Sequence, residues 1–281
     1  MQGIALHAGT AVAVRLLPAP ADAGIAFVRV DGQRRSRPIP ASHANVVGTA
    51  MQTVLAGPDG ATVATVEHLL AALSSCGVDN ATVEVDGPEL PIGDGSAAAF
   101  VDLIDRAGTL AQEAPRRLLR VRRPVRVEDG RRWVEAIPGE GFTVSCRVVH
   151  DGPPIGVQEA ACTLDEASFR RDLAGARTYG FLAELDGLKA RGLAHGASLD
   201  NAVVIDGGRV LNPGGLRHAD EFVRHKLVDL VGDLALAGVR IEGRVRSEQG
   251  GHTLNLRLLR ALFADPAAFS VEAAAPAAAA Q

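Results

Sequence analysis

The sequence is poor in cysteine, lysine and aromatic residues. Its three cysteines are an odd number, lie far apart and form no C-x-x-C pair (Cys76, Cys146 and Cys162). They suit a reducing cytosol and argue against a disulfide framework or a thiolate zinc site. Of the 29 basic residues only two are lysines, Lys189 and Lys226. A lysine kept beside a candidate functional residue therefore indicates a role that a planar guanidinium would not fill.

Signals for export, membrane insertion and nucleic-acid binding are also missing. The first residues, MQGIALHAG, lack the basic stretch and the apolar run of a signal peptide, and no apolar run is long enough to span a bilayer. The net charge is −4 and the isoelectric point is near 6.1, which gives no reason to expect nucleic acid or an anionic membrane as the main partner. We therefore expect a soluble, cytoplasmic monomer.

The remaining composition predicts a folded α+β protein. Of 281 residues, 47% are hydrophobic and 22% charged, which suits one large domain or two ordinary ones. Strands are expected at 11–16, 24–30, 81–85, 118–121, 133–137, 142–149 and 239–245. Helices are expected at about 66–76, 96–107, 165–174, 220–237 and 254–263. Thr65 is the expected cap of the first helix and Gly77 its stop, and Asp94-Gly95-Ser96 is interpreted as a turn and helix cap.

The two halves repeat one plan, in which strands precede a histidine-bearing helix that a glycine ends. We therefore expect two domains, each a β-sheet packed against helices. The first domain is placed at 1–112, a polar linker at 113–117 and the second domain at 118–265, with a glycine-rich segment at about 175–208. The alanine-rich end, 266–281, is expected to be disordered.

The helix expected at 220–237 places His225, Asp229 and Asp233 one turn apart on one side. An imidazole and a carboxylate at i and i+4 can reach one metal ion. The opposite side carries a regular apolar stripe, which fits a helix with a solvated polar face. Phe222 and Leu236 fall within the polar arc, as they would in the wall of a cleft. Taken alone, this helix slightly favours the solvated face over a metal site.

Glu67 and His68 open an earlier helix and could supply a carboxylate base and a ligand to the same site, although a single helical histidine is more often structural. The two helices together offer His68, His225 and Asp229 as ligands. Three nitrogen or oxygen ligands with one open position are typical of catalytic zinc, whereas a structural site is closed by four. The sequence thus predicts a hydrolase in which Glu67 takes a proton from zinc-activated water.

Two further residues fit such a site. His252 lies in a glycine-rich turn, and Asp233 could orient its imidazole and keep it protonated, although a plain strand-to-helix turn is the simpler interpretation. Lys226 could contact a substrate phosphate, or could be retained by chance. The other histidines have no partner pattern and are interpreted as structural or solvated: His7, His43, His150, His195 and His218.

Six segments resemble the zinc-dependent UDP-3-O-acyl-N-acetylglucosamine deacetylases of lipid A synthesis. They are GIALHAG at 3–9, TVEHLLAAL at 65–73, ELPIGDGSAAAFV at 89–101, RTYGF at 177–181, DEFVRHKLVDLVGDL at 220–234 and GGHTLN at 250–255. They follow the order of the family and cover nearly the whole chain except its end. Several are long and specific, so we identify the chain as similar to this family.

The resemblance implies an active site between the two domains. It implies zinc ligands at His68, His225 and Asp229, with Fe²⁺ as a possible alternative metal. It implies a general base at Glu67. It also implies a general acid or electrostatic stabiliser at His252, with Asp233 as the partner carboxylate.

The resemblance also implies substrate contacts. Thr178 would stabilise the oxyanion, Lys226 would contact the substrate, and Tyr179 and Phe181 would lie near the sugar or nucleotide. The segment 193–202 would line an apolar passage for the acyl chain, with Leu193, Ala194, Ser198 and Ala202 as its candidate lining residues.

The sequence departs from the family pattern in a few places. The N-terminus is shorter by about one strand. Gln52 stands where many members have cysteine, and Gln249 where a second substrate-facing lysine is common. Ala194 and His195 replace bulkier or apolar residues of the acyl passage. These departures affect the expected acyl-chain preference and phosphate contacts and leave the core chemistry intact.

The implied activity is hydrolysis of the acetamide of UDP-3-O-acyl-N-acetylglucosamine to acetate and a free amine, the committed deacetylation of lipid A synthesis. Two alternatives share part of the pattern. One is a metal-dependent deacetylase of another N-acetyl sugar nucleotide, which would differ in the 193–202 segment. The other is a non-catalytic nucleotide-sugar binding module, against which the joint presence of Glu67, Asp233 and His252 argues.

Overall fold

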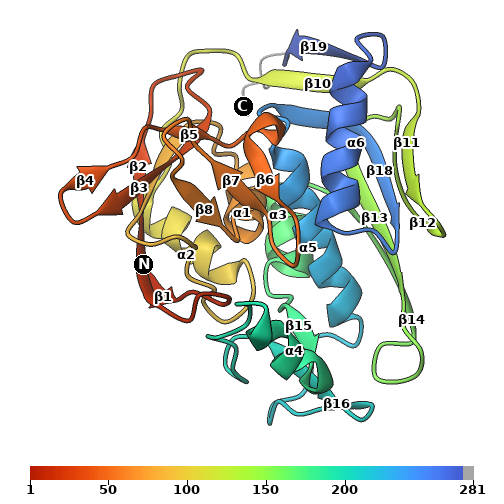
Figure 1. Cartoon of the computed structure of the whole chain (residues 1–281). Coiled ribbons are helices and arrows are strands. Elements are labelled where there is room, and N and C mark those ends of the chain that lie inside the picture. The colour runs from red at the N-terminus through yellow and green to blue at the C-terminus, as the bar shows by residue number, and fades with distance from the viewer. Residues whose placement is uncertain (275–281) are drawn as a thin grey trace.

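The computed structural model describes residues 1–274 and confirms the predicted α+β class. Two larger sheets lie on either side of a central group of helices (Figure 1). Within the described residues, every helix is too short or too polar to cross a lipid bilayer. The domain boundaries 112/113 and 117/118 stay predictions, although the sheets do divide between the two halves of the chain.

The first larger sheet belongs to the N-terminal half and has the order β1-β2-β9-β3-β4, with β5 paired to β3. Its strands are β1 (Gln2–Ile4), β2 (Ala11–Pro18), β3 (Ile25–Asp31), β4 (Arg34–Arg35), β5 (Ile39–Pro40) and β9 (Ala81–Val85). Alternation in β2 buries Val12 and Val14 and leaves Arg15 exposed, as expected for a sheet with one covered face. The helices α1 (Glu67–Ser75) and α2 (Ala98–Ala107) follow in the same half.

A small antiparallel sheet leads into α1. It consists of β6 (Val46–Gly48), β7 (Val54–Ala56) and β8 (Thr62–Ala64), preceded by a 3-10 turn at His43–Asn45. The sequence did not predict these strands, because three-residue strands carry too few side chains to show an alternation.

The second larger sheet has the order β11-β12-β18-β10-β19, and β13 joins β18 to β14. Its strands are β10 (Arg117–Val121), β11 (Val125–Asp129), β12 (Arg132–Ile137), β13 (Phe142–Val149), β14 (Val157–Thr163), β18 (Arg240–Glu248) and β19 (Phe269–Ala273). Helix α5 (Glu221–Ala235) packs on β13 and β14, and α6 (His252–Ala264) packs on β11 and β12. Helix α5 also packs against α1 of the first half, and α6 packs against α5 (Figure 1).

The glycine-rich segment forms a separate lobe beyond one end of α5 (Figure 1). Before it, α3 (Glu166–Ser168) continues as a π-helix, Phe169–Leu173. The lobe contains β15 (Tyr179–Phe181), a 3-10 turn at Leu182–Glu184, α4 (Leu185–Ala190), β16 (Val203–Asp206) and β17 (Arg209–Val210). The predicted insert was expected to end at about 208, but the last strand of the short sheet β15-β16-β17 extends to Val210.

Two sequence predictions are wrong. The end of the chain was expected to be disordered from 266, but β19 pairs along all five residues of β10. Its Phe269 ring packs 5.2 Å from that of Phe263, so this pairing covers an edge that β10 would otherwise expose. The rest of the predicted tail, 275–281, lies outside the described residues. Thr65 does not cap α1: Val66 occupies the N-cap, and Thr65 has a φ of 56°.

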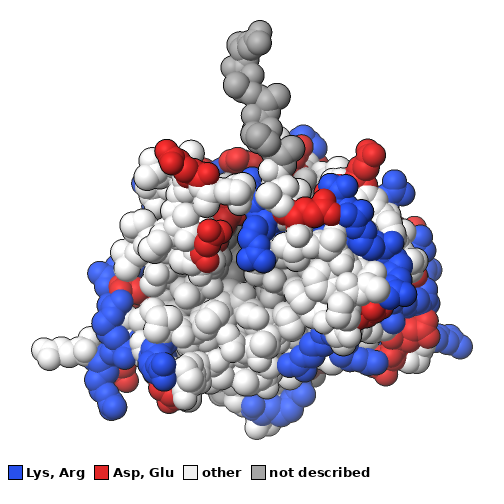
Figure 2. Space-filling view, turned by 90° about the horizontal axis from the view of Figure 1, so that it is seen from above, with Lys and Arg blue, Asp and Glu red and all other residues white. Residues whose placement is uncertain are grey.

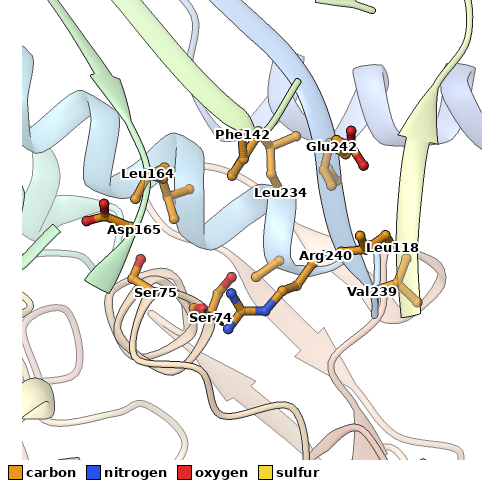
Figure 3. Close-up of a pocket in the computed structure, with 14 residues that line it drawn as sticks. Ser74, Ser75, Leu118, Phe142, Leu164, Asp165, Leu234, Val239, Arg240 and Glu242 are labelled. Atoms are coloured by element: carbon orange, nitrogen blue, oxygen red, sulfur yellow. Dashed lines mark hydrogen bonds between the residues drawn. The ribbon is translucent and has the colours of Figure 1, made fainter. Parts of the chain in front are cut away.

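The two halves also meet at the C-terminal ends of α1 and α5. A pocket lies there between the end of α1 and the second larger sheet (Figure 3). Arg240 of β18 reaches across, donating to the Ser74 carbonyl at 2.8 Å and to Asp79 at 3.3 Å. Seen from above, uncharged residues fill the middle of the molecular surface and most charged side chains surround them (Figure 2).

The closest approach between the halves is the packing of α1 on α5. A Cβ atom added to Gly232 of α5 would lie 1.9 Å from the carbonyl oxygen of Glu67 in α1. Only glycine leaves room for this contact between two helix backbones. Both helices are largely buried, and Leu69 and Leu73 of α1 and Val228 of α5 are each at most 1% exposed. The start of α1 is therefore held directly against the last turn of α5.

We predict that Gly232→Ala lowers the free energy of unfolding by about 1–3 kcal/mol or more, because the added methyl group forces the two helices apart. Chemical denaturation followed by circular dichroism measures this change. Gly187→Ala is the matched control, because Gly187 lies in α4 and nothing lies within 4 Å of its added Cβ. The control is expected to be neutral or slightly stabilising, and equal effects of the two variants would contradict the packing argument.

Candidate active site

Helices α1 and α5 bring His68, His225 and Asp229 together in a buried cluster. The Asp229 Oδ1 atom lies 3.5 Å from His68 Nε2 and 3.3 Å from His225 Nε2. The two imidazole rings stand at 88° with centroids 4.9 Å apart. One ligand atom from each residue lies within 4.8 Å of the other two, so these residues form a group that could hold a metal ion.

The spacing of the three atoms fits tetrahedral zinc. Ligand atoms about 2.0–2.1 Å from zinc, at tetrahedral angles, lie about 3.3–3.4 Å from one another. The separations of Asp229 Oδ1 from His68 Nε2 and from His225 Nε2 are both close to that edge. The cluster contributes two nitrogens and one carboxylate oxygen, and the three cysteines are free and buried elsewhere. Three such ligands leave a fourth position for water or substrate.

The contacts around the cluster fix two of its members. The Nδ1 atom of His225 lies 3.1 Å from the carbonyl oxygen of Ala176, and this contact favours the tautomer that frees Nε2 for a metal. Lys226 Nζ donates to Asp229 Oδ2 at 2.8 Å, so Oδ1 is left facing the two imidazoles. His68 Nδ1 is buried and has no partner among the described residues. Only His225 therefore has a protein group that orients its ring.

Electrostatics keep the ligands in the forms that bind metals. Burial lowers the pKa of His225 to about 3, so its imidazole is neutral at physiological pH. Burial opposes ionisation of Asp229, but the contacts with His225, Lys226 and His68 outweigh it, and the pKa of Asp229 lies well below its usual value. Metal ligands must be deprotonated, and both groups are.

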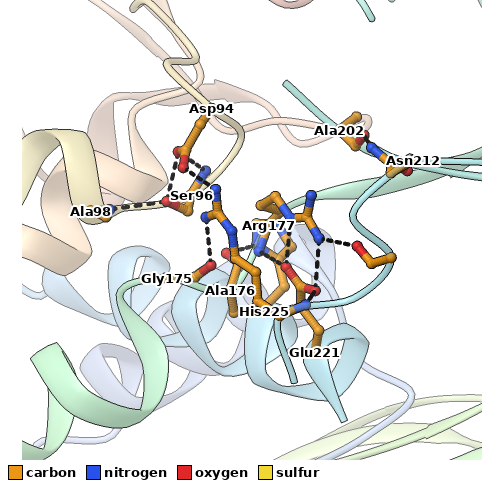
Figure 4. Close-up of polar contacts among 12 residues, drawn as sticks. Asp94, Ser96, Ala98, Gly175, Ala176, Arg177, Ala202, Asn212, Glu221 and His225 are labelled. Carbon is orange, nitrogen blue, oxygen red and sulfur yellow. Dashed lines mark hydrogen bonds and ion pairs between the residues drawn. The ribbon is translucent and has the colours of Figure 1, made fainter. Parts of the chain in front are cut away.

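The carbonyl that orients His225 is held on both sides by an ionic network (Figure 4). The fully buried Glu221 carboxylate accepts from Arg177 Nε at 2.8 Å and from the Arg177 backbone at 3.0 Å. On the other side Arg217 donates to the Gly175 carbonyl at 2.9 Å and pairs with Asp94 at 2.7 Å. Ala176 lies between these anchors, so the network places its carbonyl oxygen against α5.

Glu67 and His252 lie beside the ligand cluster, at the starts of α1 and α6. Glu67 Oε1 is 3.8 Å from His252 Nε2, and Glu67 is 3% exposed. Burial raises the pKa of Glu67, partly offset by the charges of His252 and His68. On the far side of the ring, His252 Nδ1 lies 2.8 Å from Asp233 Oδ2. The structure therefore brings together the predicted base, the predicted acid and its predicted partner.

The buried carboxylates around His252 favour its protonated form. Burial alone would lower the pKa of this imidazole, but Asp233 and Glu67 outweigh burial and raise the pKa to about 10. Asp233 also accepts from Asn255 Nδ2 at 2.8 Å and from the Thr53 hydroxyl at 2.6 Å. His252 is thus an imidazolium at neutral pH, capable of donating a proton or a hydrogen bond.

The predicted substrate-contacting residues divide into two groups. Lys226 Nζ lies 5.6 Å from the centre of the Tyr179 ring, which packs edge-on against Phe222. The His150 ring lies 5.5 Å from that of Phe181 and 6.2 Å from that of Tyr179, so His150 belongs to this aromatic group. Thr178 is placed through its backbone, which donates to the Gly95 carbonyl at 2.8 Å.

The second group is the segment 193–202, which packs on the GIALHAG loop. The Ala194 amide donates to His7 Nδ1 at 3.2 Å, and the His195 and Gly196 amides donate to the carbonyls of His7 and Leu6. Ser198 and Ala202 are anchored within the lobe by Asn201 and Asn212. Leu193 bonds back to Leu188 at the end of α4. No hydrogen bond or ion pair joins these residues to the ligand cluster in the described part of the chain, and their role in an acyl passage stays a prediction.

Sequence reasoning missed several residues that hold the site. Glu89 is 2% exposed and accepts from the backbone amides of His7 and Ala8 and from the Thr65 hydroxyl. Gln52 also accepts from Thr65, at 2.8 Å. The quoted motifs contain His7, Thr65 and Glu89, but the contacts among them span up to 82 residues and have no periodic signature.

Three possible metal ligands with an open fourth position lie next to a buried carboxylate and an imidazolium. This combination is typical of the active site of a metal-dependent hydrolase. The family model described as UDP-3-O-acyl N-acetylglycosamine deacetylase matches residues 1–264. The chain belongs to this family.

Several curated proteins with the same name as the family are similar to this chain over most of their length. A UDP-3-O-acyl-N-acetylglucosamine deacetylase of Phenylobacterium zucineum is 49% identical over 96% of this chain and 92% of the relative. The protein of the same name from Syntrophotalea carbinolica is 47% identical over 94% and 85%. That from Shewanella oneidensis is 44% identical over 98% and 92%. The six segments quoted above thus belong to a similarity along nearly the whole chain.

We predict that His225→Ala weakens zinc binding by roughly 100-fold or more, because it removes a ligand rather than an outer contact. Competition with a zinc chelator measures the affinity. His43→Ala is the control, since its ring stacks on Phe263 at 4.5 Å, away from the cluster. Unchanged zinc affinity in the His225 variant would exclude it as a ligand.

We also predict that His252 titrates near pH 10 in the metal-free protein and at a lower pH in Asp233→Asn, which loses the main opposite charge. Imidazole NMR signals report this titration. The folded pKa exceeds the unfolded value of about 6.5, so protonation stabilises the fold fully below pH 6.5. That contribution disappears as the pH rises through about 10. Identical titration of the two proteins would contradict the assigned Asp233–His252 pair.

Proposed function

We propose that this protein is a zinc-dependent deacetylase that removes acetate from UDP-3-O-acyl-N-acetylglucosamine in lipid A biosynthesis. The observation that carries the proposal is the placement of Glu67 and His252, 3.8 Å apart, beside the His68, His225 and Asp229 cluster. This is an arrangement for general acid–base hydrolysis next to a Lewis acid. The names of the relatives supply the substrate.

Zinc is the proposed metal because two imidazoles, one carboxylate and an edge near 3.3 Å suit its tetrahedral coordination. Fe²⁺ accepts the same donor types. When bound, the ion supplies Lewis acidity, which polarises an amide carbonyl and makes water more acidic. The residues of the chain then account for positioning and proton transfer.

Glu67 is the proposed general base. Its raised pKa matches it better to accepting a proton near neutral pH than an ordinary carboxylate. One of its oxygens, Oε2, accepts from the backbone amide of Thr53 at 3.1 Å. The other, Oε1, faces His252 and is proposed to take the proton of the attacking water.

His252 is the proposed electrostatic stabiliser and proton donor to the leaving amine. Asp233 holds Nδ1, so Nε2 is the nitrogen that points toward Glu67 and the reaction centre. Thr178 is proposed to donate its hydroxyl to the developing oxyanion. Lys226, Tyr179 and Phe181 are proposed to contact the substrate, and the 193–202 segment to receive the acyl chain. A cytoplasmic location and a monomeric state stay predictions of the sequence.

The test is acetate release by Glu67→Gln, which keeps the size of the side chain and removes its basicity. Turnover is expected to fall by roughly 100- to 10,000-fold, with zinc content unchanged because Glu67 is not a ligand. Glu166→Gln, on the exposed start of α3, is the control and should keep full activity. Turnover of the Glu67 variant within a few-fold of wild type would refute the base assignment.

The same assay distinguishes the substrates. The 3-O-acylated nucleotide sugar should be hydrolysed, and UDP-N-acetylglucosamine without the acyl chain should be a much poorer substrate. Equal turnover of both would favour a deacetylase of another N-acetyl sugar nucleotide. Binding of both without acetate release, in zinc-loaded wild-type protein, would favour a binding module.

A further inference from the structure

Thr53 connects the two carboxylates of the site, although it lies on neither helix. It immediately precedes β7 and is 1% exposed. Its backbone N–H donates to Glu67 Oε2 at 3.1 Å, and its hydroxyl donates to Asp233 Oδ1 at 2.6 Å. The first contact stays within the N-terminal half, and the second crosses to α5. One residue therefore touches both the base and the partner of the imidazole.

We propose that Thr53 is a positioning residue for the deacetylation, setting the placement of Glu67 relative to the Asp233–His252 pair. The inference rests on the proposed function, because it assigns a task to a residue of the same site. Within residues 1–274, Thr53 makes no hydrogen bond to the ligand cluster or to His252. It acts only through the two carboxylates.

The contact with Glu67 fixes the orientation of that carboxylate. With Oε2 anchored on the Thr53 amide, rotation about the last bond of the side chain is opposed, and Oε1 stays toward His252 at 3.8 Å. The anchor is a backbone amide, so substitution of the Thr53 side chain leaves it in place. The effects of such a substitution therefore report on the hydroxyl alone.

The contact with Asp233 completes a fully bonded buried carboxylate. Asp233 is 2% exposed, its Oδ2 accepts from His252 Nδ1 and Asn255 Nδ2, and its Oδ1 accepts from the Thr53 hydroxyl. No other side chain in residues 1–274 donates to Oδ1. A buried acceptor that loses its donor is strongly destabilised and turns toward a new partner. Because Oδ2 holds the His252 ring, such a turn displaces the imidazole from Glu67.

The same loop contains a natural comparison. Four residues earlier, the Thr49 hydroxyl lies 2.9 Å from the Thr253 hydroxyl at the start of α6. This contact also joins the two halves through a threonine hydroxyl, but it is exposed and touches no carboxylate. If hydroxyl contacts mattered only by holding the halves together, loss of either one would have similar consequences. If Thr53 positions the carboxylates, only its loss should affect turnover.

The experiment compares Thr53→Val, Thr53→Ser and Thr49→Val in acetate release. We expect Thr53→Val to lower kcat by roughly 10- to 100-fold, since a hydrogen bond to a charged group is lost, with KM within about twofold of wild type. Thr53→Ser should restore most of the lost kcat, and Thr49→Val should behave as wild type. Zinc content is expected to stay the same in all three variants.

A second readout is independent of activity. In the metal-free protein, the His252 Nδ1 proton shared with Asp233 gives an NMR signal that should move or broaden in Thr53→Val and stay unchanged in Thr49→Val. If Thr53→Val does not fold, Thr53→Ala replaces it, with the same direction expected for kcat and for this signal.

Wild-type kcat in the folded valine or alanine variant, or equal losses in the Thr53 and Thr49 variants, would overturn the proposal. A rise in KM with unchanged kcat, or a loss of zinc content alone, would overturn it as well. Either result would place Thr53 in substrate binding or in metal binding. Failure of the proposed function is recognised separately, since wild-type protein would then release no acetate.

Discussion

The contact between the Glu67 carbonyl and Gly232 is the constraint on which the site depends. The three proposed metal ligands come from both halves of the chain, and neither α1 nor α5 carries all of them. A group whose atoms must converge within 4.8 Å requires the helix axes to approach more closely than most side chains allow. Gly232 permits this approach one turn beyond Asp229. The bond from Thr53 to Asp233 and the approach of Asp229 to His68 both cross between the halves and depend on this packing.

The close packing brings several charged side chains into a buried space, where most of them are paired. Asp229 pairs with Lys226 and Asp233 with His252, each at 2.8 Å. Glu67 is the third buried carboxylate, and its nearest cation is the already paired His252 at 3.8 Å. A divalent cation in the neighbouring cluster would balance this excess of negative charge. Burial raises the pKa of Glu67, with smaller contributions from Asp233 and Asp229. A cation bound nearby would oppose these effects, so the proposed metal and the proposed base would be electrostatically coupled.

Local patterns in the sequence predicted the larger elements. Helical spacing put His225 and Asp229 on one face, and alternation located the strands of the two larger sheets, because both signals lie within a few residues. That spacing made the two residues a plausible pair of ligands, although the helix alone slightly favoured a solvated face. His68 and the Asp233–His252 pair were weak candidates from the residues alone, and the resemblance to a family made them specific. Thr53 was missed, since its two carboxylate partners lie 14 and 180 residues away.

The cap assigned to Thr65 failed because its hydroxyl bonds to Glu89 and Gln52. Composition concealed β19, whose pairing depends on an open edge of β10.

The central claim is that two helices from different halves jointly bind one zinc ion without a thiolate. X-ray absorption at the zinc edge of the purified protein tests it most directly. The account predicts a single shell of nitrogen and oxygen atoms at about 2.0–2.1 Å, with scattering from two imidazole rings. A sulfur shell at about 2.3 Å, or scattering from only one imidazole, would contradict it.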